Sequence, residues 1–398
     1  MPTLFLLLFL ILVVSADPQT FYLKNHHSRT PPVYDVESGA NLYLASNDDW
    51  MYLKNITFKT GNNTYTLEKL LVPNDDGSAA SIPVAGDFSI YNTNNETVTR
   101  RLTGFFYITT ALQTQDPTFH VFVLQTTQSV RVTGISSTVV ILNTGLINFT
   151  DYTEPTMTSY VTNINQSPNT NLYFHWGMPY DDWKSQTNNT FFQNPIVYLV
   201  MMRFNTHVSH RFFDHVEPLQ VGLDYWYFTV DGPVNMYMEN KYVRIDNYNT
   251  NTTATSTTGV MISTYLFVEC SVEIRPIEYG VGVAGYIITT FMDDDGSMLD
   301  IELFYDDFYP SSYNDYQCNN IGVLYFDYQQ AYSVTVRRYE GGTFYLQYFN
   351  FAGDVWQTST VGNKVTSTTP VATTHKNGSA AVFAIKFVVF VLMASLLS

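Results

Sequence analysis

The sequence has few charged residues for its length. Of 398 residues only 14% are charged, whereas a typical globular protein has about 25%. Lys and Arg number 19 against 35 Asp and Glu, so the formal net charge is −16. Binding to nucleic acid requires clustered Lys and Arg that neutralise phosphates, so no nucleic-acid partner is expected. Intrinsic disorder is excluded as well, because 45% of the residues are hydrophobic.

Cysteine is also scarce, since the chain contains only Cys270 and Cys318. In an oxidising compartment two cysteines of one domain are expected to pair, so the sequence predicts a disulfide between them. Closing a loop of about 50 residues would stabilise the fold by roughly 4 kcal/mol in the chain-entropy model. Two free thiols are the alternative. A disulfide would leave no thiolate for nucleophilic catalysis.

Motifs for catalysis and cofactor binding are lacking too. The sequence has no Gly-x-Ser-x-Gly nucleophile elbow and no His-Glu-x-x-His zinc motif. Residues 280–285 match the letters of the dinucleotide fingerprint, but the following Tyr286-Ile287-Ile288-Thr289-Thr290 is typical of a strand. The fingerprint requires a helix there. We therefore expect glycines of a β-turn or bulge, and no cofactor.

Two weaker patterns concern metals. Asp293, Asp295 and Glu302 have the spacing of three calcium-loop ligands, but Phe291 falls where the first ligand belongs. An Asp-Gly hairpin turn between 286–291 and 298–305 is the simpler interpretation, with a loose calcium site that adds Asp306 or Asp307 as the alternative.

Three histidines, His207, His210 and His215, cluster beside Asp214 and could in principle hold zinc. A strand over 198–213 would place His207 and His210 on opposite faces, so no metal site is predicted.

Paired carboxylates precede tryptophan at two places, Asp48-Asp49-Trp50 and Asp181-Asp182-Trp183. A ring that packs on a pyranose beside two carboxyl groups suits a glycosidase. Surface turns next to a core tryptophan are the simpler interpretation. A carbohydrate-acting hydrolase is therefore kept as an alternative function.

The N-terminus predicts entry into the secretory pathway. Residues 1–16 contain an apolar run from Leu4 to Val14, followed by small residues suited to cleavage after Ala16. Asp17-Pro18 would stop a helix at this point.

The C-terminus predicts attachment to a membrane. Residues 378–398 are an apolar anchor signal interrupted by Lys386 and Ser395, and Asn377 is the expected residue for attachment of a glycosylphosphatidylinositol lipid. A transmembrane helix is the alternative. It would bury Lys386 in the bilayer, and no Lys or Arg follows it to hold the cytoplasmic side.

Glycosylation triplets are frequent. They predict modified asparagines at Asn55, Asn62, Asn95, Asn148, Asn188 and Asn251. Asn165 also matches, but Pro168 follows its triplet and is expected to impair use.

Short alternating segments rich in Val, Ile, Thr, Tyr and Phe predict an all-β fold. Ser263–Arg275 alternates most clearly and places Cys270 on its apolar face. Further hairpins are expected for 119–124 with 129–132 and for 333–339 with 343–349.

Gly104–Thr110 and Gly285–Thr290 look like copies of one repeat, each followed after nine steps by a strand. We expect two β-sandwich modules in tandem, CUB-like or jelly-roll-like, at 17–210 and 211–356. A Ser/Thr-rich stalk would follow at 357–377.

The chain resembles the CUB-like-domain proteins of nematodes over about residues 20–130, with a second copy over about 215–310. The segments that suggest this resemblance are residues 39–44 before Asn47–Trp50, and Gly104–Thr110 before Phe119–Leu124. The resemblance implies an extracellular β-sandwich with a role in epithelial or innate-immune defence. It departs from CUB domains in lacking their four cysteines and acidic calcium triad.

The sequence thus predicts a lipid-anchored glycoprotein of the outer plasma-membrane face that is not an enzyme and that binds extracellular protein or glycan ligands. Calcium-dependent adhesion is a further alternative.

Overall fold

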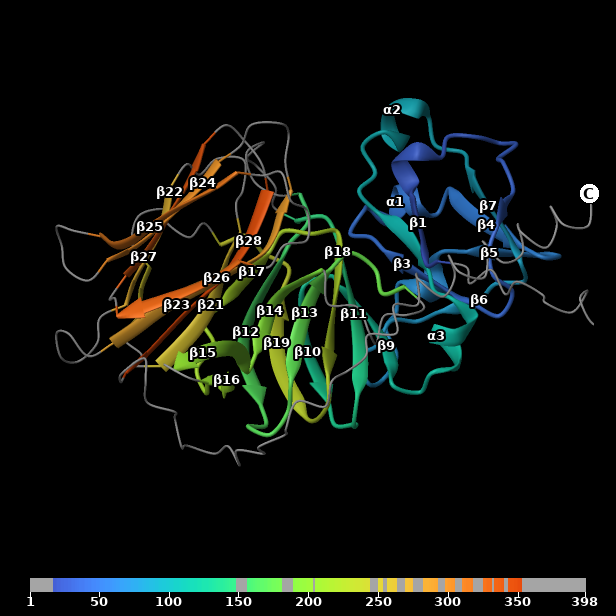
Figure 1. Ribbon diagram of the computed structural model, residues 1–398. Coiled ribbons are helices and arrows are strands. Elements are labelled where there is room, and N and C mark those ends of the chain that lie inside the picture. The colour runs from blue at the N-terminus through green and yellow to red at the C-terminus, as the bar shows by residue number, and fades with distance from the viewer. Residues whose placement is uncertain are drawn as a thin grey trace, which may run out of the picture. The chain divides into compact units, whose positions relative to one another are not determined.

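The structure is a computed structural model, and nearly every element it describes is a strand (Figure 1). The described residues are 17–147, 156–180, 189–202, 205–243, 250–252, 256–262, 269–274, 282–292, 298–304, 310–317, 325–330, 333–339 and 343–352. Helices within them are short: α1 (Trp50–Leu53), α2 (Glu96–Thr99), α3 (Ala111–Gln115) and the 3-10 turns η2 (Leu23–Asn25) and η3 (Glu68–Leu70). The predicted all-β sandwich class is confirmed.

The N-terminal part folds into two four-stranded antiparallel sheets. The first sheet has the order β1-β8-β3-β6 and the second β2-β7-β4-β5. Their strands are β1 (Gln19–Tyr22), β2 (Tyr34–Asp35), β3 (Asn41–Ala45), β4 (Ile56–Thr60), β5 (Asn63–Thr66), β6 (Ile82–Pro83), β7 (Asp87–Asn92) and β8 (Phe105–Ile108). Phe58, Phe88 and Phe106 pack between the two sheets in one apolar core. We call this part the N-terminal sandwich.

The next part, the middle sandwich, pairs a five-stranded sheet, β14-β13-β18-β11-β9, with a four-stranded sheet, β10-β19-β12-β17. Their strands are β9 (Phe119–Leu124), β10 (Thr127–Val132), β11 (Ser137–Asn143), β12 (Ser159–Gln166), β13 (Leu172–Trp176), β14 (Thr190–Asn194), β17 (Leu219–Val221), β18 (Tyr225–Val230) and β19 (Val234–Glu239). Trp226 and Phe174 are buried at the centre of its core.

Strand β11 is buried at all of its positions. Val139 and Ile141 belong to the core of the middle sandwich. Val140 and Leu142 pack instead with Phe105 of β8, in a second apolar cluster. A strand that is covered on both faces needs a continuous apolar run rather than alternation. This explains the sequence Val-Val-Ile-Leu.

The last part, the C-terminal sandwich, pairs a five-stranded sheet, β20-β22-β27-β24-β25, with a four-stranded sheet, β21-β28-β23-β26. Their strands are β20 (Thr250–Thr252), β21 (Ser256–Ile262), β22 (Glu269–Ile274), β23 (Gly282–Met292), β24 (Met298–Phe304), β25 (Pro310–Gln317), β26 (Tyr325–Gln330), β27 (Ser333–Tyr339) and β28 (Thr343–Ala352). Ile301, Val336 and Leu346 are among its buried residues. A strand and not a helix contains Tyr286–Thr290, as predicted. Gly282 and Gly285, however, lie within β23 in regular register and not in the expected turn or bulge, since the register shift of β23 falls between Ile288 and Thr290.

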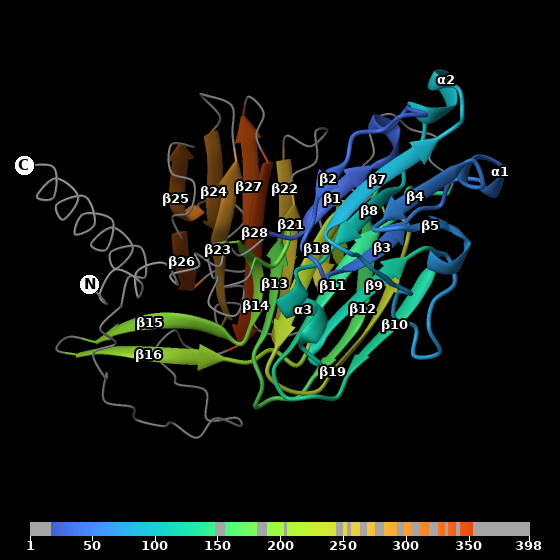
Figure 2. The same cartoon turned by 90° about the vertical axis from the view of Figure 1, so that its right-hand side faces the viewer.

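Strands β15 (Ile196–Met202) and β16 (Asn205–Arg211) form a separate two-stranded sheet, visible as a long hairpin in Figure 2, in place of the single strand expected over 198–213. His207 pairs with Val200 and His210 with Val197. These register positions alternate between the faces of the hairpin, so the two histidines lie on opposite faces, as predicted.

The three predicted hairpins are wrong. β9 pairs with β11, whereas β10 pairs with β19 in the opposite sheet. β23 and β24, and likewise β27 and β28, also belong to different sheets. In each case the turn carries the chain across the sandwich instead of back along the same sheet. A short connection between two strands permits either path, because it sets where the chain reverses and not which strand becomes the hydrogen-bonding partner.

The sheets divide the chain differently from the expected modules 17–210 and 211–356. β18 and β19 follow residue 211, but they pair with β11 and β10, which precede it. Both expected copies of the repeat place consecutive strands in different sheets. The strand pairing of the two copies differs, however. β9 pairs in parallel with β11, whereas β24 pairs antiparallel with both β25 and β27.

Several predictions lie outside the described residues: the signal peptide, the stalk, Asn377 and the apolar tail. Among the residues that are described, no helix is both long and apolar enough to cross a bilayer.

Candidate functional site

The sheet β10-β19-β12-β17 has one buried and one accessible face. In β19, Val234, Met236 and Met238 are buried, while the residues between them are exposed or half-buried. The same alternation continues in the three neighbouring strands. The accessible side chains, here called the outer face, are Thr127, Ser129, Arg131, Tyr160, Thr162, Asn165, Gln220, Asn235, Tyr237 and Glu239.

The outer face is ordered in rows across the strands. One row runs Thr127, Glu239, Tyr160, Gln220, a second runs Ser129, Tyr237, Thr162, and a third runs Arg131, Asn235, Asn165. A β-bulge between Thr162 and Asn165 takes up Asn163 at φ 53°. The extra residue keeps Asn165 on the same face as Thr162.

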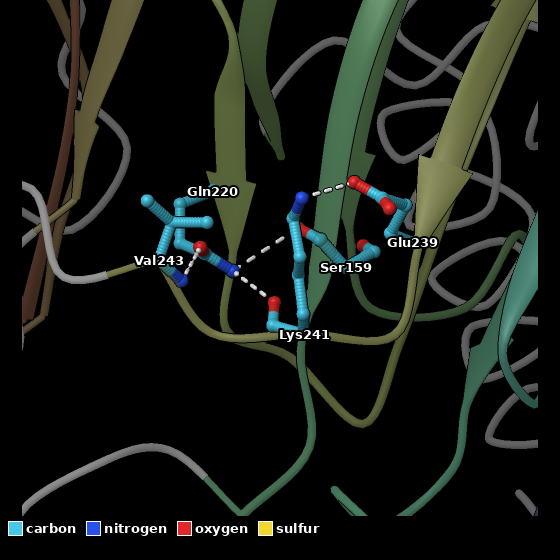
Figure 3. Close-up of polar contacts among 5 residues, drawn as sticks. All are labelled: Ser159, Gln220, Glu239, Lys241 and Val243. Atoms are coloured by element: carbon cyan, nitrogen blue, oxygen red, sulfur yellow. Dashed lines mark hydrogen bonds and ion pairs between the residues drawn. The ribbon is translucent and has the colours of Figure 1, made fainter.

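Lys241 lies over one end of this face, just after β19. Its ammonium group is 4.8 Å from the centre of the Tyr160 ring and forms an ion pair with Glu239 (Figure 3). The Lys241 side chain is 43% exposed and that of Glu239 27% exposed. The cation is therefore oriented by its two neighbours but stays accessible to a ligand.

Hydrogen bonds to the backbone hold the segment that carries Lys241. Gln220 Nε2 donates to the Lys241 carbonyl at 3.3 Å, and Gln220 Oε1 accepts from Val243 N at 2.9 Å (Figure 3). Asn240 Nδ2 donates to the Thr144 carbonyl at 2.9 Å. With the segment fixed on both sides of Lys241, the site is organised before any ligand arrives.

The first predicted carboxylate pair is structural. The Asp48 carboxylate accepts hydrogen bonds from Ser46 Oγ at 2.8 Å, Thr103 N at 2.9 Å and Gly104 N at 2.8 Å. Asp49 caps α1 by accepting from Met51 N at 2.8 Å. Each acid thus stabilises its own loop through backbone hydrogen bonds. Asp181, Asp182 and Trp183 lie outside the described residues.

The calcium and zinc patterns were considered only as alternatives to a structure without a metal site. Within the described residues, no group of three or more His, Cys, Asp or Glu side chains could hold an ion. Glu302, the last position of the calcium pattern, accepts from Arg337 at 2.6 Å. Asp293, Asp295, Asp306 and Asp307 lie outside the described residues.

The predicted disulfide stays a prediction. Cys270 lies on β22, in register with Val336, but Cys318 lies outside the described residues.

The glycosylation triplets differ in how accessible they are. Asn62 and Asn95 are exposed, whereas Asn55 is half-buried. Asn55 Nδ2, the atom that would carry the sugar, donates to Asn94 Oδ1 at 2.9 Å and to the Met51 carbonyl at 3.3 Å. Asn251 is described only by its place on β20, and Asn148 and Asn188 lie outside the described residues.

No residue of the outer face was singled out from the sequence as part of a binding surface, and Asn165 was named only for its glycosylation triplet. The signal was present, because Val-Asn-Met-Tyr-Met-Glu in β19 alternates strictly. Alternation predicts a half-exposed strand. It does not tell which strands place their polar sides together.

Fold and site define a β-sandwich protein with an accessible, polar and aromatic sheet face. A family model described as "Transmembrane glycoprotein" matches residues 37–393, so the chain belongs to the transmembrane glycoprotein family. This membership confirms the coarser expectation of a membrane or cell-surface glycoprotein.

Other comparisons add little. Curated proteins include none that matches this chain. Among solved structures, one described as "Crystal structure of infectious bursal disease virus VP2 subviral particle" is similar over 82% of this chain and 72% of its own, at 9% identity and a TM-score of 0.15. A superposition this loose does not relate individual elements.

Proposed function

We propose that this protein is a cell-surface binding protein that recognises an extracellular protein partner through the outer face. One observation carries the proposal: an accessible sheet face combines Tyr160, Tyr237 and Arg131 with short Ser, Thr and Asn side chains in regular rows. Tyr and Arg are enriched at the centres of protein interfaces. Antibody binding loops combine Tyr with Ser and Asn in the same way.

Charge supports a specific role for this face. The chain carries −16, yet the outer face together with Lys241 contains two cations, Arg131 and Lys241, and one anion, Glu239. A negatively charged partner would therefore be repelled less by this face than by the acidic remainder of the chain.

A binding screen with matched variants tests the proposal. The secreted ectodomain would be screened against extracellular proteins and a glycan array. Lys241→Glu should weaken the hit at least tenfold, because it replaces the cation over Tyr160 with a second acid beside Glu239. Lys69→Glu makes the same charge change at an exposed position on η3 and should leave binding unchanged. Equal effects of the two variants would refute the assignment, and a glycan hit alone would replace the protein partner.

Asn165 supplies a second test of the same face. Pro168→Ala should make its triplet a better acceptor, so that a glycan is added on the outer face. Gain of that glycan with loss of binding would support the proposal, whereas gain of the glycan with binding intact would contradict it.

We also propose that the protein is held at the membrane by a lipid attached at Asn377. The apolar tail contains Lys386, and a bilayer span would bury this charge at a cost in free energy. Phosphatidylinositol-specific phospholipase should release the protein from cells. Retention after complete digestion of a control anchored protein would establish the transmembrane alternative. The CUB-like resemblance adds epithelial or innate-immune defence as the proposed setting.

A further inference from the structure

A polar pocket of the N-terminal sandwich lies beside α2. It has a volume of about 550 Å³ and is lined by residues 27–29 on one side and 92–96 on the other. Pockets that hold small ligands fall in this size range. The pocket is unrelated to the outer face, which belongs to the middle sandwich.

Hydrogen bonds from Asn92 connect the two segments that line the pocket. Asn92 is buried; its Nδ2 donates to the His26 carbonyl at 2.9 Å, and its Oδ1 accepts from Asn94 N at 2.9 Å. Asn92 N donates to the Ser28 carbonyl at 3.3 Å, which joins the two walls. The walls are thus held in place without a ligand.

Asn95 stands at the edge of this pocket and begins a glycosylation triplet, Asn95-Glu96-Thr97. Its Oδ1 caps α2 by accepting from Val98 N at 2.8 Å. The cap uses the oxygen of the amide and leaves Nδ2, the sugar-bearing atom, outside the hydrogen bond. Asn95 can therefore carry a glycan and cap its helix at the same time, whereas at Asn55 the nitrogen itself is engaged.

Two basic side chains at the pocket are available to a ligand. Arg29 and His27 are both exposed, and among the described residues neither side chain has a recorded hydrogen bond or ion pair. Glu96, by contrast, is paired with Arg100. A guanidinium group offers several donors in one plane and suits the carbonyl and hydroxyl oxygens of an N-acetylated sugar.

We propose that the glycan on Asn95 folds back into this pocket, with its first N-acetylglucosamine held by Arg29 and the 92–96 wall. The pocket is then a site for the protein's own carbohydrate. The docked sugar fastens α2 and the 27–29 segment to each other. Asn62, which stands in the turn between β4 and β5, is exposed and does not line this pocket, so its glycan serves as the comparison.

The test compares two glycan-deficient variants of the secreted protein. Thr97→Ala removes the Asn95 triplet but keeps the Asn95 cap, and Thr64→Ala removes the Asn62 triplet as its matched control. We expect Thr97→Ala to lower the melting temperature by about 2–4 °C and Thr64→Ala to leave it within about 1 °C. Alanine favours helix more than threonine does, so a loss at Thr97 cannot come from helix propensity.

Two further measurements separate the docked sugar from other effects. Endoglycosidase H leaves one N-acetylglucosamine on high-mannose protein and should preserve the melting temperature, whereas complete removal by peptide N-glycosidase F should lower it. Arg29→Ala should lower the melting temperature of the wild type and have no effect on Thr97→Ala, as coupled residues do in a double-mutant cycle. The proposal is overturned by an unmodified Asn95 in peptide mapping, by equal behaviour of Thr97→Ala and Thr64→Ala, or by additive effects of Arg29→Ala and Thr97→Ala.

Discussion

Replacing Asp48 by Asn should destabilise the N-terminal sandwich far more than the same change at its neighbour Asp49. Asp48 joins the loop after β3 to the residues before β8 through Ser46, Thr103 and Gly104. An Asn amide would place N–H groups opposite some of these donors and remove the negative charge that they share.

The magnitude follows from the number and kind of bonds lost. Hydrogen bonds to a charged group contribute about 1.5–3 kcal/mol each, and an Asn side chain can keep part of the set. We expect Asp48→Asn to lower the free energy of unfolding by about 2–4 kcal/mol. The two segments approach closely here, since a Cβ built on Gly104 would lie 2.6 Å from Ser46 Cβ. Asp49→Asn should cost less than about 0.5 kcal/mol, since Asn caps a helix as well as Asp.

Urea unfolding followed by both circular dichroism and tryptophan fluorescence would measure this difference. Trp50 directly follows Asp48-Asp49 in the sequence and is 43% exposed, so one of the five tryptophans of the chain emits from the affected region. The two variants should unfold with the same m-value as the wild type, which shows that only stability changed. Equal midpoints for the two variants would refute the reasoning. An Asp48→Asn protein with normal stability and a lost hydrolytic activity would instead revive the glycosidase alternative.

Three further predictions concern the core and the surface. Burial lowers the pKa of His175 from 6.5 to about 4, so its folded state binds fewer protons than the unfolded state. Stability should fall by up to about 3 kcal/mol as the pH drops from 6.5 towards 4, and His175→Gln should flatten this slope in thermal melts. Tyr22→Phe removes a 2.6 Å hydrogen bond to Asp224 and should cost about 1–2 kcal/mol in urea unfolding; an unchanged midpoint would show that the bond contributes nothing. Peptide mapping should find Asn55 unmodified because its Nδ2 donates twice, and high occupancy there would contradict this.

Much of the fold class could be predicted because the relevant pattern is local. In β19 the apolar residues Val234, Met236 and Met238 alternate with polar ones, and the strand has the expected buried and open sides. Successive side chains of a strand point to opposite faces whatever lies beyond them. The opposite faces of His207 and His210 could be predicted for the same reason.

The candidate site could not be predicted, because it is assembled from distant segments. Tyr160, Gln220 and Glu239 share one row although they lie on three strands spread over some 80 residues of chain. The residues that did attract attention, Asp48 and Asp49, owe their place in the sequence to loop fastening and helix capping. A carboxylate looks the same in the sequence whether it binds a backbone N–H or a substrate.

Composition and local pattern were enough to establish an acidic, strand-rich chain and to predict a membrane or cell-surface glycoprotein, because these properties depend on residue type and short-range order. The partners of each strand were decided only in the folded molecule. Backbone N–H and C=O groups are alike in every strand, so the choice between returning to a neighbour and crossing the sandwich depends on which apolar faces can be buried together. That choice separated β9 from β10 and β27 from β28, and it also brought the rows of the outer face into register.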